Sequence, residues 1–284
     1  MPSAKCHVIG KGRQPLARVC FMKPHPDAAS LLPSAFAERL VKSLPRQFAA
    51  SSALLTHSSM LAIFVDMSGR RHRIPADRFA LPERAILRKP EPFLVLCHRI
   101  IPSPTTLIAV FPRTARKNGA VRGSSLPGTG RINLFINARA RWKSDLPVTL
   151  CHEYYHSVEK SRRTKRKPWW YADMVTEGLA EHFAIAMSGA RIRNSSLISE
   201  HFTVAEAKRA LTILWAAQRA NRKTIPDLRL YEHVVMKGPH HLGAYLVGAF
   251  IKVRQIEWDE AMHLKTDDVW KDGLAALGIK TGRR

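Results

Sequence analysis

Cysteine and long apolar runs are scarce in this sequence, and each scarcity excludes a class of protein. The four cysteines form no CxxC pair, which argues against a zinc ribbon and against a secreted domain held together by disulfides. The longest apolar stretch, 242–251, is about half the length that a membrane span needs. The N-terminus lacks the apolar core of a secretory signal. We expect a cytoplasmic protein with free thiols, while the basic N-terminus leaves a transit peptide or secretion as alternatives.

Acidic residues are also few, because 22 Asp and Glu stand against 46 Lys and Arg, a formal net charge of +24. Such a charge predicts sequence-independent attraction to polyanions. The densest basic run is 162–167, which is either a positive lip beside a cleft or a solvated loop. Trp169, Trp170 and Tyr171 follow it directly. They are either a stacking platform or a buried anchor for the next helix.

One short motif predicts a metal site. Residues 152–156 read His-Glu-Tyr-Tyr-His, and on a helix residues four apart lie about 6 Å along the axis and about 40° around it. His152 and His156 can therefore each place a ring nitrogen roughly 2.0–2.1 Å from one Zn²⁺. Glu153 can reach a water beside the metal without ligating it. Cys151 points away from this face and is interpreted as helix packing.

A second helical pattern, about 170–188 with Gly189 as its stop, carries acidic residues on one stripe. Asp173, Glu177 and Glu181 lie at successive four-residue steps. The alternative to a metal site is two ordinary amphipathic helices with solvated acids and a core histidine. Asp145 precedes Leu146 and Pro147 and is expected to be the N-cap of the first helix.

The two patterns together, HEYYH and then VTEGLAEHF, resemble the zincin metallopeptidases of the glutamate-ligand type. More narrowly, they resemble a bacterial family of predicted zinc-dependent proteases. The resemblance implies one zinc ion per chain, with His152 and His156 as ligands, Glu177 as third ligand and Glu153 as general base. Glu181 is then expected to accept the free N–H of a ligating imidazole.

Further site residues are predicted with alternatives. Asp173 either serves the other histidine or is a solvated acid. The segment 241–248 resembles the Gly-Tyr-rich helix of that family, and by analogy Tyr245, His241 or His240 would stabilise the oxyanion. The same helix is equally interpreted as a close-packed core element.

The pattern of elements predicts an α+β, zincin-like fold: a small mixed β-sheet with an edge strand over the HExxH helix, then a mainly helical C-terminal half. An irregular basic segment, 1–30, would precede a single domain, 31–284. That domain would have a β-rich part at 55–140, the metal-site helices at 145–189 and a helical part at 200–280. Expected strands are 61–66, 93–101 and 106–111, a loop is expected at 112–130, and later helices at about 203–221, 239–256 and 266–277.

The strand 131–138 alternates cleanly, with Ile132, Leu134 and Ile136 on one face. It is our candidate for the edge strand, because a peptide added to a free edge is held by main-chain hydrogen bonds. Asn133 and Phe135 would then contact the substrate. The alternative is that this strand is internal to the sheet.

These expectations converge on a zinc-dependent peptidase that hydrolyses peptide bonds with a metal-activated water and Glu153 as general base. The partners expected are a peptide or protein substrate and, non-specifically, polyanions. Two alternatives stay open. One is a basic nucleic-acid-associated metalloprotein that acts on DNA-bound proteins, and the other is a non-catalytic zinc-binding module.

Overall fold

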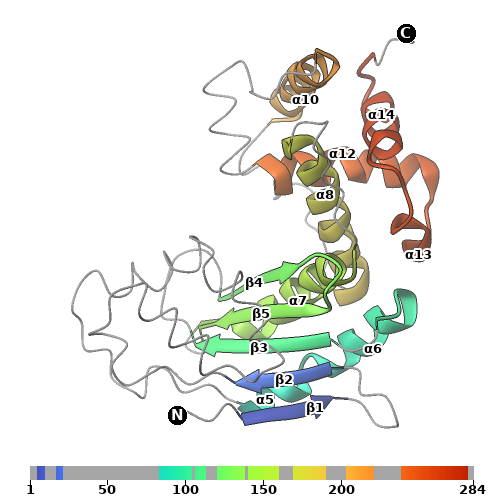
Figure 1. Cartoon of the computed structure of the whole chain (residues 1–284). Coiled ribbons are helices and arrows are strands. Elements are labelled where there is room, and N and C mark those ends of the chain that lie inside the picture. Colours follow the sequence, from blue (N-terminus) through green and yellow to red (C-terminus); the bar gives the residue numbers. More distant parts are fainter. Residues whose placement is uncertain are drawn as a thin grey trace. The chain divides into compact units, whose positions relative to one another are not determined.

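The computed structural model describes residues 5–9, 17–21, 83–103, 106–112, 120–137, 140–159, 169–189, 203–220 and 238–280. They fall into two compact units, the first within 1–98 and 103–157 and the second within 99–102 and 158–284. The first contains a sheet and the second is helical (Figure 1). The expected α+β composition is therefore confirmed, and helices hold most of the described residues.

The first unit contains a five-stranded mixed sheet in the order β1-β2-β3-β5-β4, with β1 and β4 at its two edges (Figure 1). β2, β3 and β5 run parallel, while β1 and β4 are antiparallel to their neighbours. The bounds of the strands are β1 Lys5–Ile9, β2 Ala17–Phe21, β3 Thr106–Pro112, β4 Val121–Leu126 and β5 Arg131–Ile136. The prediction that 1–30 is irregular is wrong, since this segment supplies β1 and β2. Five-residue strands gain stability from pairing with neighbours, and their own sequence gives little signal.

The prediction that 131–138 forms the edge strand is also wrong. β5 pairs with β3 on one side and with β4 on the other. Its residues after Arg131 are buried on both faces. The clean alternation of residue types does not reflect exposure, because Asn133 and Phe135 are covered as well.

The edge strand next to it is β4, which lies inside the segment 112–130 that was expected to be a loop. Its sequence, VRGSSL, is rich in Gly and Ser and carries little strand propensity. Pairing with β5 over its whole length makes it a strand. The turn that follows contains Gly128 and Gly130 at φ values of 71° and 65°, which glycine adopts without a steric cost.

Three helices precede or follow the strands along this part of the chain, namely α5 (Glu83–Arg88), α6 (Glu91–Ile100) and α7 (Trp142–Val158). The strand expected at 93–101 is α6, because its continuous apolar run buries Leu94 and Cys97 at helical spacing. The Cys97 Sγ lies 3.6 Å from the Cys151 Sγ of α7. This confirms that Cys151 serves helix packing.

The second unit consists of α8 (Trp169–Ser188), α10 (Val204–Arg219), α12 (Gly238–Arg254), α13 (Trp258–Ala261) and α14 (Thr266–Ala276). The stop at Gly189, with φ of 63°, and the capping box of Thr203 with Glu206 are confirmed. Trp170 and Tyr171 are buried against the Trp270 ring of α14, so these two are a buried anchor and not a stacking platform.

Helices α8 and α12 pack closely because glycines lie at their crossing. A Cβ at Gly178 would come within 2.3 Å of the Gly243 carbonyl oxygen, and a Cβ at Gly243 would come within 2.2 Å of the Met174 carbonyl oxygen. The backbones of the two helices therefore touch. This contact fixes how α12 lies against α8 within the second unit.

Two predicted features lie outside the described residues, namely the strand at 61–66 and the basic run 162–167. In the part of the chain that the structure describes, every helix is too short or too polar to span a membrane.

Candidate metal centre

Helix α7 places the two histidines of the HExxH motif on one face, as their four-residue spacing predicts. The Nε2 atoms of His152 and His156 are 3.0 Å apart, and the rings meet edge-on with centroids 4.7 Å apart. Both side chains are buried at 9 % relative exposure. Two ring nitrogens therefore converge on one point beside the helix.

This donor pair fits a zinc ion. Two nitrogens that each bind tetrahedral Zn²⁺ at about 2.0–2.1 Å are about 3.3 Å apart, close to the separation of the two Nε2 atoms. Facing lone pairs of two neutral imidazoles repel each other unless a proton or a cation lies between them. Buried histidines in this arrangement thus suit a cation, and the i, i+4 spacing of α7 supplies the geometry.

Glu153 follows the first histidine and is directed at β4. Its carboxylate oxygen Oε2 accepts a hydrogen bond of 2.6 Å from the Ser125 hydroxyl. Gly123, two residues earlier on the same strand, faces the Glu153 side chain as well. Glu153 is 7 % exposed, so its side chain is a buried acceptor held between the HExxH helix and the edge strand.

Asp145 belongs to the same helix but is not its N-cap, because α7 begins three residues earlier at Trp142. Its Oδ2 accepts the backbone N–H of Ala120 at 2.8 Å. The first turn of α7 is thereby joined to the residue that precedes β4. The sequence signal for a helix start was right to within one turn, and the role of the carboxylate is different.

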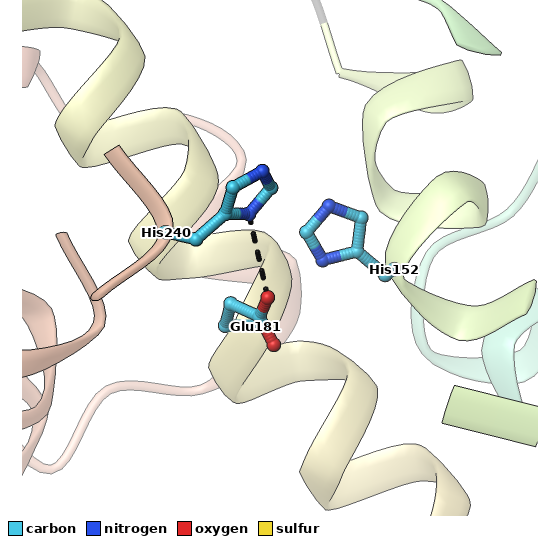
Figure 2. A group of neighbouring side chains, drawn as sticks. All are labelled: His152, Glu181 and His240. Atoms are coloured by element: carbon cyan, nitrogen blue, oxygen red, sulfur yellow. Dashed lines mark ion pairs between the residues drawn. The ribbon is translucent and has the colours of Figure 1, made fainter. Parts of the chain in front are cut away.

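The acidic stripe of α8 belongs to the second unit, together with His240 at the start of α12. The His240 Nδ1 lies 3.1 Å from the Glu177 Oε2 and 3.4 Å from the Glu181 Oε1. Figure 2 draws the pair that His240 makes with Glu181, along with His152 of α7 in the first unit. Two carboxylates one helical turn apart therefore share one imidazole. Sequence reasoning placed Glu177 and Glu181 on one stripe but missed this contact with His240.

The remaining predicted residues lie as follows. Asp173 is half-buried on α8, one turn before Glu177. His241 and Tyr245 lie on α12, and burial raises the pKa of the Tyr245 phenol, which keeps it a hydrogen-bond donor. The proposed oxyanion role of His241 or Tyr245 stays a prediction.

Asn133 and Phe135 do not line a free edge, because both belong to the internal strand β5. Asn133 pairs with Ser124 of β4 and donates to its hydroxyl through Nδ2 at 3.3 Å. Since Gly123 and Ser125 face Glu153, the alternation of the strand places Ser124 and Asn133 on the opposite face of the sheet. The substrate-binding role predicted for Asn133 and Phe135 lacks the free edge that it required.

The His and Glu side chains that offer donor atoms to a metal ion are His152 and His156 in the first unit, and Glu177, Glu181 and His240 in the second. An α+β protein with an HExxH helix in one unit and a His/Glu cluster in the other is a candidate His/Glu metalloprotein. Residues 97–271 match the family described as predicted Zn-dependent protease (DUF2268). Because this match spans more than half of the 284 residues, the chain belongs to that family. No curated protein matches the chain.

Proposed function

We propose that the protein is a zinc-dependent peptidase of the zincin type with a glutamate as third ligand. The observation that carries the proposal is the pair of buried imidazoles on α7, with Nε2 atoms 3.0 Å apart and Glu153 beside them. The family to which the chain belongs is described as a predicted Zn-dependent protease. A purely structural zinc site would have no use for a buried carboxylate next to its ligands.

His152 and His156 would hold zinc through Nε2, and Glu177 would complete the ligand set from α8. Glu181 would then accept a hydrogen bond from an imidazole N–H. When bound, zinc supplies the Lewis acidity that polarises a scissile carbonyl and makes a water molecule acidic near neutral pH. Glu153 would take the proton of that water and pass it to the leaving amide nitrogen.

The substrate would bind to β4 instead of β5. Among the described strands, β4 pairs with β5 alone, which leaves its other side as an edge. An extended peptide would add to this edge through main-chain hydrogen bonds and would place its scissile bond near Glu153. This arrangement suits a peptidase with modest side-chain selectivity.

Metal analysis of purified variants tests the proposal. We expect close to one zinc per chain in the parent and loss of zinc in His152→Ala and in His156→Ala, since two remaining ligands hold Zn²⁺ poorly. His263→Ala is the matched control, because this exposed histidine follows α13 and lies outside the HExxH motif. A parent protein free of zinc after purification without chelators would overturn the proposal.

The Glu153→Gln variant separates a peptidase from a non-catalytic zinc-binding module. Glutamine keeps the size of the side chain and removes the base, so zinc should stay bound while peptide hydrolysis falls by several orders of magnitude. Cleavage of a casein or mixed-peptide substrate, assayed beside zinc content, gives both readouts. Equal cleavage by parent and variant would exclude Glu153 as the base.

A further inference from the structure

Three hydrogen bonds join α7 to the edge strand β4 and to the residues that flank it, with one donor before the strand, one within it and one at the end of the turn that follows. Two of these bonds come from backbone amides and one from a side-chain hydroxyl. They run in the same order along both elements, so β4 and α7 lie side by side in parallel. The bonds are Ala120 N–H to Asp145 Oδ2 at 2.8 Å, Ser125 Oγ–H to Glu153 Oε2 at 2.6 Å, and Gly130 N–H to the Ser157 carbonyl at 2.8 Å.

The middle bond engages the carboxylate that we propose as the general base. Among the described residues, Ser125 is the hydrogen-bond partner of the Glu153 side chain. A bond of 2.6 Å lies at the short end of the range for O–H···O hydrogen bonds. Without it, the carboxylate of a residue that is 7 % exposed would lose its donor in a place that water reaches poorly.

A second, independent feature of β4 acts on the same side chain. A Cβ at Gly123 would lie 2.2 Å from the Glu153 Cγ and 2.6 Å from its Oε1. The Glu153 side chain therefore occupies the space that any side chain at position 123 would fill. Because successive residues of a strand alternate, Gly123 and Ser125 share this face and Ser124 does not.

We propose that Gly123 and Ser125 are positioning residues for the carboxylate of Glu153, an inference that rests on the proposed peptidase function for its catalytic consequence. Gly123 provides the space through which the side chain runs, and Ser125 fixes Oε2 and hence the plane of the carboxylate. A glutamate side chain is otherwise free to turn about several bonds. β4 thus sets the geometry of the base as well as offering an edge for substrate.

The kinetic test compares Ser125→Ala with Ser124→Ala, an equal substitution one residue away on the opposite face of β4. We expect Ser125→Ala to lower kcat by about 10- to 100-fold, since a misplacement of about 1 Å costs that much, with KM and zinc content unchanged. Ser125→Thr keeps the hydroxyl and should recover most of kcat. Ser124→Ala, which removes the contact with Asn133, should lower kcat clearly less than Ser125→Ala does.

Gly123→Ala reaches the same carboxylate by a different route. Its methyl group would meet the Glu153 side chain from Cγ outward instead of a backbone. The whole side chain would have to turn away, so the protein should fold and bind zinc while kcat falls. If Ser125→Ala and Gly123→Ala both cleave peptides at the parental kcat, the proposal is overturned.

A measurement without substrate separates this proposal from the peptidase function. Thermal unfolding of the parent, Ser125→Ala, Glu153→Ala and the double variant forms a cycle that reports the contact alone. We expect Ser125→Ala to lower the midpoint by about 3–6 °C in the parent and by clearly less in the Glu153→Ala background. Equal shifts in both backgrounds would overturn the positioning role. Unequal shifts of the midpoint in a protein that cleaves no peptide would support the positioning role and contradict the peptidase proposal instead.

Discussion

Glu177 and Glu181 both lie close to the imidazole of His240, and this contact limits which roles the two carboxylates can have. His240 Nδ1 lies 3.1 Å from one and 3.4 Å from the other. A protonated His240 would neutralise part of the charge of two acids that lie one turn apart. A glutamate that ligates zinc gives up one oxygen to the metal and can keep the second for His240. We therefore assign His240 to both acids, as a partner that holds them in place.

Zinc titration of Glu177→Ala and Glu181→Ala distinguishes the ligand from its neighbour. Loss of the direct ligand should abolish stable zinc binding, whereas loss of a hydrogen-bonding neighbour should weaken it by about 10- to 100-fold. Competition with a chromophoric chelator measures both. A larger loss in Glu181→Ala would exchange the two assignments and leave His240 with the same partners.

His182 predicts a pH dependence of stability. Burial lowers the pKa of this imidazole below its ordinary value of 6.5, against the opposing effects of the Ala244 carbonyl and Glu181. As pH falls, His182 is therefore protonated more readily in the unfolded chain than in the folded chain. Stability from His182 is therefore complete above about pH 6.5 and is lost as pH falls towards the folded pKa.

The comparison with His182→Gln isolates this effect in metal-free protein. Glutamine keeps a donor for the Ala244 carbonyl, which the His182 Nε2 approaches to 2.8 Å. The difference in unfolding free energy between parent and variant should shrink between pH 7.5 and pH 5.5. A difference that stays constant in urea titrations at both pH values would contradict the expectation.

At the scale of elements, the crossing of α8 and α12 tolerates no side chain at its centre. The Cβ of an alanine at position 178 would meet backbone atoms of Gly243 at 2.3 and 2.5 Å. Backbone cannot move aside without parting the helices. An alanine at position 248 would instead meet the His182 ring at 2.9 and 3.0 Å, and a side chain can turn away.

Gly178→Ala should accordingly destabilise the protein by about 1–3 kcal/mol or more, as overpacking does, despite the better helix propensity of alanine. Gly248→Ala should cost clearly less. Urea unfolding of the two variants, which make the same substitution in helices that contact each other, measures the difference. Equal midpoints would mean that α8 and α12 can separate at little cost.

Elements with a strong local pattern were predictable from the sequence, and elements defined by their neighbours were not. The capping box at Thr203 and the glycine stop at 189 depend on residues within one turn, and both are present. The continuous apolar run at 93–101 suits a buried helix as well as a strand, so the sequence predicts a strand where the structure has α6. β4 carries Gly and Ser because Gly123 and Ser125 face Glu153, so its composition follows a contact that the sequence does not display.

The same distinction holds for the candidate site, where contacts set by local spacing were predictable and contacts between distant residues were not. The two histidines face each other because of a spacing within one helix, and this was visible in the sequence. The contacts of Glu153 with Ser125 and of Glu177 with His240 join residues 28 and 63 positions apart. No periodicity reports pairs at such separations. Within β4, the Gly-x-Ser spacing is too common to have indicated a role.

At the scale of the whole molecule, charge is the dominant property. A formal net charge of +24 predicts binding to heparin and to duplex DNA that depends on counterion release. Affinity should fall steeply between about 50 and 200 mM salt and show little preference for sequence. Neutral dextran serves as the control ligand in the same assay. Sequence-selective binding that persists at high salt would favour the nucleic-acid-associated alternative over non-specific attraction.

The bonds that join α7 to the residues flanking β4 make two backbone amides into reporters of motion. The N–H groups of Ala120 and Gly130 donate to acceptors on α7, and neither belongs to the ladder between β4 and β5. Exchange of the Ala120 amide with deuterium therefore requires the segment before β4 to part from α7, and exchange of the Gly130 amide requires the turn before β5 to part from it. Slow exchange at both positions would mean that the residues flanking β4 stay in contact with α7 in the native state. Faster exchange at one position would show whether the segment before β4 or the turn before β5 parts from α7 more readily.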